Sequence, residues 1–212
     1  MLNRKSNKMN KLRTLTFIVA LVFLFQMEAT TQNHDEVQTL FNKKDLHKEI
    51  GFSVTPGFAL TEMDGATASL FHIRGGINFS DKITLGGFYN TSLNEIHPKS
   101  ETLPEIYMDY WSLGGFLEYT IFSRKLIHAT FPILIGGGEV EMDDEWGDNG
   151  LGESNFFLVE PIALLELNLH KYVRFNIGAG YRFIGEMNYR NFNHQDISGP
   201  TGYIGLKFGL FR

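Results

Sequence analysis

The chain has 212 residues and a formal net charge of −5, with 43% hydrophobic and 20% charged residues. This composition excludes wholesale disorder, and the length suffices for one domain with a sizeable core. The mean hydropathy of −0.13 excludes a bundle of transmembrane helices, each of which needs about 20 apolar residues. The absence of cysteine excludes disulfides, thiolate metal sites and a lipid-modified N-terminal cysteine.

Residues 1–31 predict a secretory signal peptide. Five basic residues precede an apolar run from Leu15 to Phe25, which is too short to span a membrane as a helix. Cleavage is expected after Ala29 or Thr31, and residues 32–48 are then a periplasmic N-terminal segment of open role. Loss of five basic residues and one acidic residue changes the net charge from −5 to −9, which disfavours nucleic-acid binding.

From residue 49 onward, apolar and polar residues alternate with a period of two, which is typical of β-strands. In residues 173–183, for example, apolar side chains take the odd positions, while Arg, Asn and Gly take the even ones. Eight such segments are expected, near 49–61, 67–79, 83–94, 106–122, 126–141, 156–169, 173–188 and 199–211.

The predicted connections alternate between short turns and long loops. About three residues connect the segments at 80–82, 123–125 and 170–172, whereas 95–105, 142–155 and 189–198 are long, and a shorter connection lies near 62–66. This anatomy predicts an all-β, eight-stranded antiparallel up-and-down transmembrane β-barrel over residues 49–212. Three-residue turns pair residue 79 with 83, 122 with 126 and 169 with 173. Bulges or local widening are expected at Pro56, Pro132 and Pro161, because a closed barrel has no edge strand.

The apolar face of the alternation is expected to contact lipid. A soluble carrier would turn the same face inward, but an eight-stranded interior only just holds its side chains, and this face carries Phe, Leu, Ile or Tyr in every segment. Aromatic residues gather toward the segment ends, as interfacial girdles require. Small residues suit a crowded lumen, and the opposite face holds Gly76, Gly86, Gly114, Gly136, Gly138, Gly178, Gly180, Gly205 and Gly209.

The signal peptide, the eight long segments and the amphipathic terminal segment Gly202–Phe211 resemble the small outer-membrane β-barrel proteins, including transmembrane domains of OmpA and OmpX type. The stretch Asp196–Gly202, followed by Gly205–Gly209, is similar to uncharacterised outer-membrane barrels of Bacteroidota. The resemblance is architectural and covers about residues 48–212. It implies a barrel in the outer membrane of a Gram-negative bacterium. The chain departs from the family at its end, where Phe211 falls on the inward parity and leaves the register of Phe211 and Arg212 open.

The inward parity carries a set of charged residues that predicts a polar network in the lumen. In the expected register Glu160 lies across from Arg182, and Glu166 lies diagonal to Arg174. Buried charges in a narrow barrel must be paired, so a structural network is favoured over a catalytic pair of carboxylates, and a conducting pore is not expected. The predicted members are His72, Arg74, Glu118, Glu160, Glu166, Arg174, Arg182 and Lys207.

The connection from Glu139 to Glu153 carries seven acidic residues and no basic one. Its hard oxygen ligands are chemically suited to Ca²⁺, although their spacing differs from that of an EF-hand loop, and a solvated loop is the simpler interpretation. The candidate ligands are Asp143, Asp144, Glu145, Asp148 and Asn149. No other cofactor is expected, and no metal ligand is assigned.

The favoured function is non-enzymatic: a structural or surface-interaction role with both termini in the periplasm. Outer-membrane lipids, lipopolysaccharide and the barrel-assembly machinery are the expected partners, an extracellular partner could meet the long loops, and the barrel is expected to be monomeric.

The first alternative is a hydrolase similar to lipid A deacylases, which would place His and Ser two residues apart on a strand. Here His194 and Ser198 are four apart with Asp196 between them, and no Ser stands two residues from His72 or His128, so no catalytic residue is assigned. The second alternative is a secreted soluble ligand-binding barrel.

Overall fold

The computed structural model describes residues 50–79, 82–101, 103, 106–144, 152–189 and 192–211. The predicted signal peptide and the segment 32–48 lie outside the described residues. No helix among the described residues is long and apolar enough to cross a membrane.

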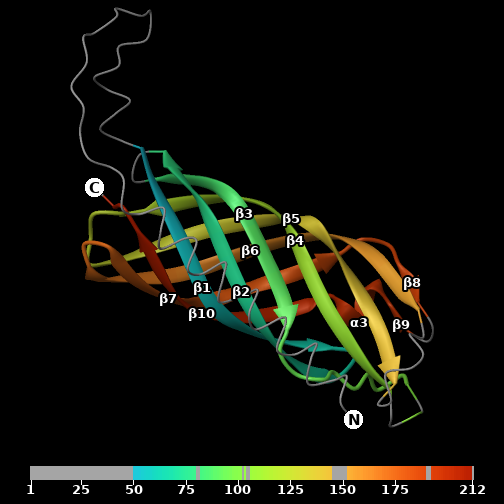
Figure 1. Ribbon diagram of the computed structural model, residues 1–212. Helices are drawn as coiled ribbons and strands as arrows, with labels where there is room; N and C mark the ends of the chain where they lie inside the picture. The colour runs from blue at the N-terminus through green and yellow to red at the C-terminus, as the bar shows by residue number, and fades with distance from the viewer. Residues whose placement is uncertain are drawn as a thin grey trace, which may run out of the picture. The chain divides into compact units, whose positions relative to one another are not determined.

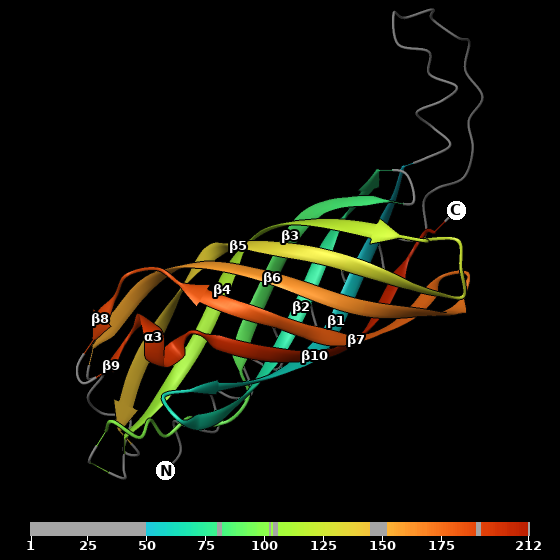
Figure 2. The ribbon, with the colours of Figure 1, turned by 180° about the vertical axis from the view of Figure 1, so that it is seen from behind.

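Eight long antiparallel strands close into one barrel in the order β1-β10-β7-β6-β5-β4-β3-β2 (Figures 1 and 2). Strands adjacent in sequence pair with each other, and β1 pairs with β10 to close the barrel. The prediction of an up-and-down barrel is therefore confirmed. The barrel strands are β1 (Ile50–Met63), β2 (Ala66–Phe79), β3 (Ile83–Ser92), β4 (Ile106–Ile121), β5 (Ile127–Asp144), β6 (Glu153–His170), β7 (Val173–Ile184) and β10 (Gly199–Gly209).

The two ends of the barrel differ in their connections. At the short-turn end lie the β2–β3, β4–β5 and β6–β7 connections, together with the first residue of β1 and the last of β10. At the long-loop end, the β7–β10 connection folds into a small hairpin of β8 (Asn188–Tyr189) and β9 (Phe192–Asn193), followed by the one-turn helix α3 (His194–Ile197). Figure 1 shows β8, β9 and α3 at the end opposite the C-terminus.

The predicted turn register holds at the β2–β3 turn, but the pair predicted at the β6–β7 turn, Leu169 with Val173, does not form because Val173 pairs with His170. Phe79 pairs with Ile83, and the β6–β7 ladder keeps the predicted register as far as Asn168, where a β-bulge shifts it by one residue. The prediction for β4–β5 is wrong by two residues, since Ile121 pairs with Ala129 and the turn contains five residues. The turn is longer because Phe122 adopts a left-handed conformation (φ 58°) and accepts a hydrogen bond from the Lys125 amide. A shift of two residues preserves the side-chain face.

The β1–β2 connection is a two-residue turn made of Asp64 and Gly65. Their φ angles of 47° and 71° are both positive, which is the backbone form that joins right-handed twisted strands tightly. Met63 pairs directly with Ala66 across it. The inward side chains therefore change from odd positions on β1 to even positions on β2.

The three strand prolines interrupt the ladder without shifting it. Pro56 lies between the β1–β10 pairs Val54–Phe208 and Gly57–Gly205, which share one register. The same uninterrupted register flanks Pro132 in β5–β6 and Pro161 in β6–β7. The expected bulges are therefore absent at these described positions. The backbone N–H of a strand residue points toward only one of its two neighbouring strands, so a proline removes one hydrogen bond and leaves the pairing register unchanged.

Inward glycines let neighbouring backbones approach closely. A Cβ on Gly86 would lie 2.0 Å from the Gly75 carbonyl oxygen, and one on Gly136 would lie 2.1 Å from that of Leu113. A Cβ on the outward Gly75 would make only ordinary van der Waals contacts, the nearest at 3.9 Å. The clash therefore comes from the adjacent strand and not from side chains across the lumen, which refines the expectation that a crowded lumen selects small residues.

Candidate functional site: a closed lumen within an apolar exterior

Every barrel strand presents large apolar side chains outward. The exposed fractions range from 43% to 58% for one such residue on each strand, Phe58, Ile77, Leu85, Leu117, Ile133, Leu165, Ile177 and Ile204. Water-exposed apolar surface of this extent is rare on a soluble monomer. The expected outward face is confirmed, and a belt of this kind argues against the soluble carrier.

A cluster of buried charges fills the lumen in the half nearer the short turns. Lys207 Nζ donates a hydrogen bond to Glu118 and lies 3.3 Å from Glu166 Oε1. Arg74 Nη1 lies 3.3 Å from Glu118 Oε2, and Arg174 Nη1 lies 3.5 Å from Glu166 Oε2. Each carboxylate is thus held by two cations, as a dehydrated charge requires. The diagonal pairing predicted for Glu166 and Arg174 is present.

His128 belongs to this charged cluster, although the predicted set lacks it. Its Nε2 lies 3.0 Å from Glu166 Oε2 and 3.3 Å from Arg174 Nη1. The signal was present in the sequence, since His128 shares the even parity of Gly136 and Gly138 on the same strand. A His between a carboxylate and a guanidinium extends the network across β5, β6 and β7.

A second polar layer lies farther toward the long loops. Tyr110 donates to Ser112, whose hydroxyl also accepts from Asn90, and Asn90 contacts His72 Nδ1. Ser112 and Tyr110 are almost fully buried. This line of hydrogen bonds joins β2, β3 and β4 and leaves the lumen filled at this level.

Glu160 and Arg182 occupy the opposed positions that the register predicts, but they bond to other groups. Glu160 Oε1 accepts from the Tyr203 hydroxyl at 2.7 Å. Arg182 Nε donates to the Ile197 carbonyl at 2.8 Å and its Nη2 to Thr61 Oγ1 at 3.1 Å. The predicted position of Glu160 across from Arg182 is thus confirmed, but Arg182 donates its hydrogen bonds elsewhere because the end of α3 offers it a backbone carbonyl. The sequence could not place that carbonyl.

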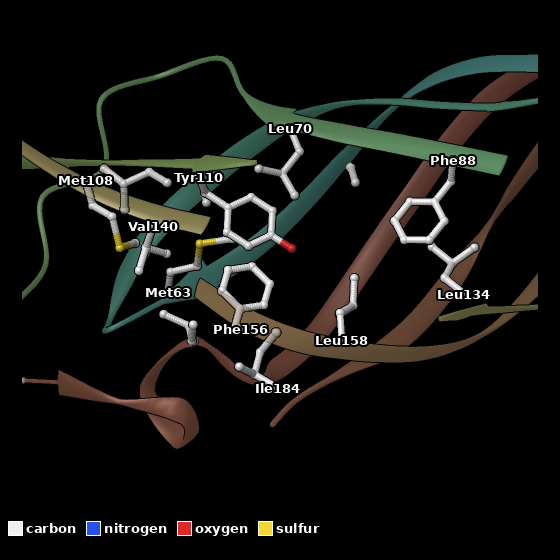
Figure 3. Packing of buried hydrophobic residues seen from close by; sticks show 14 of the residues in the cluster. Met63, Leu70, Phe88, Met108, Tyr110, Leu134, Val140, Phe156, Leu158 and Ile184 are labelled. Atoms are coloured by element: carbon white, nitrogen blue, oxygen red, sulfur yellow. The ribbon is translucent and has the colours of Figure 1, made fainter. Parts of the chain in front are cut away.

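The lumen at the long-loop end is apolar, in contrast to the polar lumen predicted from the sequence. Figure 3 shows Met63, Tyr110, Val140 and Phe156 close together there, and the Tyr110 and Phe156 rings stack at a centroid distance of 5.5 Å. The side chains are almost completely buried and include Met63, Leu70, Met108, Tyr110, Val140, Met142, Phe156, Leu158, Ile184 and Ile197. This apolar plug closes the lumen at the end opposite the charged cluster.

The hydrophobic face inverts along β4, β5 and β6. Near the short turns the apolar residues point outward, but at the long-loop end most even, inward positions are apolar, and the odd positions include five acidic residues, Asp109, Glu139, Glu141, Asp143 and Glu153. Asp109 pairs with Glu141, which pairs with Glu153. A polar exterior over an apolar interior is the pattern of a water-soluble structure. These strands therefore project beyond the apolar belt.

The outward acidic residues of this projection repel one another. Partial burial raises the pKa of Glu141, and the negative charges of Asp143, Glu139, Asp109 and Glu153 raise it further. The described residues contain no group of three or more metal-binding side chains.

Of the predicted Ca²⁺ ligands, Asp143 and Asp144 end β5, whereas Glu145, Asp148 and Asn149 lie outside the described residues.

The connections at the long-loop end bind to each other. The Asp64 amide donates to the Asp196 carbonyl at 2.6 Å, and Asp64 Oδ2 accepts from the Ser100 amide at 2.8 Å. The Lys99 amide donates to the Asp64 carbonyl at 3.0 Å. The β1–β2 turn thus ties the β3–β4 loop to α3.

The residues that could have formed a hydrolase site instead cap helix α3. Ser198 Oγ donates to the His194 carbonyl at 2.6 Å and accepts from the Ile184 amide. The Asp196 carboxylate accepts from the Asn193 amide at 2.8 Å, as in a capping box. The serine hydroxyl is held by backbone groups, so these residues do not form a nucleophile–base pair.

No family model and no curated protein sequence matches this chain. Among solved structures, the chain resembles Neisserial surface protein A, with a TM-score of 0.55 and 11% identity over 77% of this chain and 97% of that one. The outer membrane protein OprG from Pseudomonas aeruginosa gives a TM-score of 0.48 and 12% identity over 77% and 97% of the two chains.

Ail, the attachment invasion locus protein of Yersinia pestis, gives a TM-score of 0.46 and 15% identity over 76% and 99%. At 11% identity, the likeness to Neisserial surface protein A shows the fold alone, that of a small eight-stranded outer-membrane barrel. The similarity to barrels of Bacteroidota stays a prediction.

Proposed function

We propose that this protein is a non-enzymatic barrel of the Gram-negative outer membrane that acts through its long-loop end. One observation carries the proposal: an apolar belt surrounds all eight strands, while the lumen inside is filled by paired charges and an apolar plug. The belt suits the hydrocarbon of a bilayer, and a closed barrel satisfies the backbone hydrogen bonds there. A filled lumen does not support conduction.

The proposed orientation places the short-turn end in the periplasm and the long-loop end outside the cell. Short periplasmic turns and longer extracellular loops are usual in this architecture. Both described chain ends lie at the short-turn end, since Ile50 pairs with Phe79 and the Leu210 amide donates to the Phe52 carbonyl. Both termini would then be periplasmic, and the barrel-assembly machinery would read the terminal strand β10.

The proposed surface role rests on the projection beyond the belt. The apolar plug and the contacts of Asp64 hold the β1–β2 turn, the described part of the β3–β4 loop and α3 together, which lowers the entropy lost when a partner binds there. Lipopolysaccharide, Ca²⁺ at the acidic loop or an extracellular partner are the ligands proposed for this end. The role requires no cofactor and a single copy of the chain.

The test combines location and conduction. The full chain, expressed in a Gram-negative host, is expected to fractionate with outer membranes and to migrate differently on a gel when unheated than when boiled. The purified barrel is expected to give no steady conductance in a planar bilayer. Recovery in the soluble periplasm, or a steady single-channel current, would contradict the proposal.

A further inference from the structure

The short-turn end contains a cavity that the proposed function does not use. It has a volume of about 500 Å³ and opens at the mouth of the barrel. The lining residues come from the β4–β5 turn, the end of β6, the β6–β7 turn, the start of β7 and the segment after β10. They are Ser123, Arg124, Asn168, His170, Lys171, Arg174 and Phe211.

The charged side chains that line this mouth pocket are all basic. Arg124 and Lys171 come from two neighbouring turns, and Arg174 forms the floor, where its guanidinium stacks 3.7 Å from the centroid of the Phe211 ring. No acidic residue is among these lining residues. Phe211 therefore points inward, as its parity predicted, while Arg212 lies outside the described residues.

The charges behind the floor balance one another. Apart from Arg174 itself, the charged lumen cluster contains two cations, Arg74 and Lys207, against two carboxylates, Glu118 and Glu166. The lumen therefore does not supply a spare negative charge to the pocket. A pocket with low-dielectric walls and one sign of charge concentrates ions of the opposite sign.

Backbone contacts fix the turns that carry these basic residues. The Lys125 carbonyl accepts from Asn168 Nδ2 at 2.9 Å, and the Asn168 amide donates to the Leu126 carbonyl at 3.0 Å. The bulge between Asn168 and His170 redirects the chain into the β6–β7 turn. These contacts hold the backbone of the β4–β5 turn, which carries Arg124, against the end of β6, which leads into the turn that carries Lys171.

An exposed apolar collar, made of Phe122, Leu126 and Leu169, lies beside the mouth pocket on the β4–β5 turn and at the end of β6. Phe122 and Leu126 are both 65% exposed, and Leu169 is 56% exposed. Lys125 lies 4.6 Å from the centroid of the Phe122 ring, and Lys171 lies 4.8 Å from that of Tyr172. Paired aromatic and basic side chains are typical of the level where lipid headgroups meet water.

We propose that the mouth pocket binds a phosphate group, and that its source is the headgroup of a phospholipid in the adjoining leaflet. A phosphate is the anion that several converging Lys and Arg side chains recognise best at a membrane surface. The apolar collar favours the lipid over free phosphate, since it offers a surface for the acyl chains next to the basic pocket. This inference rests on the proposed membrane insertion.

The test measures binding of dihexanoylphosphatidylglycerol, below its micellar concentration, to the full barrel in nonionic detergent by isothermal titration. The double variant Arg124→Gln/Lys171→Gln is compared with Lys82→Gln, which removes an exposed basic residue of another short turn outside the pocket. Binding is expected to weaken roughly fivefold for each charge removed from the pocket, or roughly 25-fold in the double variant. The Lys82 variant should bind like the parent.

A tenfold excess of inorganic phosphate should leave the lipid bound. If the parent and the double variant bound the lipid equally well, the mouth pocket would not be the binding site. If inorganic phosphate displaced the lipid at equal concentration, the lipid headgroup would not be the preferred source of the phosphate. The heat-dependent gel shift of the same preparations separates the two proposals. Lost lipid binding with an intact shift contradicts only the pocket, whereas an absent shift contradicts membrane insertion.

Discussion

The substitution Ile177→Arg tests the outward assignment most directly. Ile177 is 48% exposed on β7, and its cross-strand neighbours Ile204 and Leu165 are 46% and 58% exposed. It therefore stands in a continuous apolar surface rather than in a core. In water, a substitution at such an exposed site would change the free energy of unfolding by about 0.5 kcal/mol or less.

In a bilayer the same change carries a large cost. An Arg on the lipid face near the midplane destabilises a barrel by about 2–4 kcal/mol, because the guanidinium must be hydrated within the hydrocarbon. This cost corresponds to a roughly 30-fold to 1,000-fold lower folding equilibrium constant. Guanidinium-induced unfolding in phospholipid vesicles, shown to be reversible for the parent, measures the difference.

Leu93→Arg is the matched control. Leu93 is 56% exposed just after β3, at the level of the outward acidic residues, where Asp109 accepts a hydrogen bond from the neighbouring Ser92. An Arg at this position lies beyond the apolar belt and near negative charge, so no loss of stability is expected. If Ile177→Arg were as stable as the parent, the odd face of β7 would not contact hydrocarbon and the assignment of faces would be refuted.

Three further predictions concern the barrel interior and its projection. Gly86→Ala is expected to lower the free energy of unfolding by at least about 1–3 kcal/mol, because the new Cβ would meet the Gly75 carbonyl at 2.0 Å, whereas Gly75→Ala should change it little; similar losses for both would contradict the close approach of β2 and β3. Glu166→Gln is expected to cost about 3–5 kcal/mol in the same assay, because it leaves Lys207 and Arg174 without their shared carboxylate, and a neutral result would show that water hydrates the network. The raised pKa of Glu141 means that the folded state binds its proton more readily than the unfolded state, so stability should increase as the pH falls from the raised value through the ordinary carboxyl range. Glu141→Gln should be more stable than the parent at neutral pH and lose this part of the pH dependence; an unchanged pH profile would contradict the repulsion.

The alternation of the sequence determined the strands, the face of each side chain and part of the register. A period of two assigns each side chain to one of two faces, and short turns fix the pairing parity, so Phe79 and Ile83 could be paired in advance. The charged lumen cluster followed from the same parity, because a buried charge in a narrow barrel must find an opposite charge. His128 could have been added on the same grounds.

Hydrogen-bond partners that loop residues supply to the lumen could not be predicted from the alternation. Arg182 bonds to the Ile197 carbonyl and not to Glu160, because helix α3 brings a backbone acceptor to the end of β7. The left-handed conformation of Phe122 lengthens the β4–β5 turn. Bulky residues rarely adopt this conformation, so the amino-acid type at position 122 does not predict it. Such contacts depend on the path of a loop in space, on which alternation carries no information.

The sequence of β4, β5 and β6 contains the inversion of the hydrophobic face. Its role in closing the lumen can be recognised only from the closed barrel. Met108 and Phe156 have the parity of the polar lumen, and their meaning as a plug depends on Met63 and Ile197 arriving from distant segments. The sequence by itself determined which face each strand residue occupies, because that is local geometry. Tertiary structure decided what fills the lumen, because the packing of side chains depends on all eight strands at once.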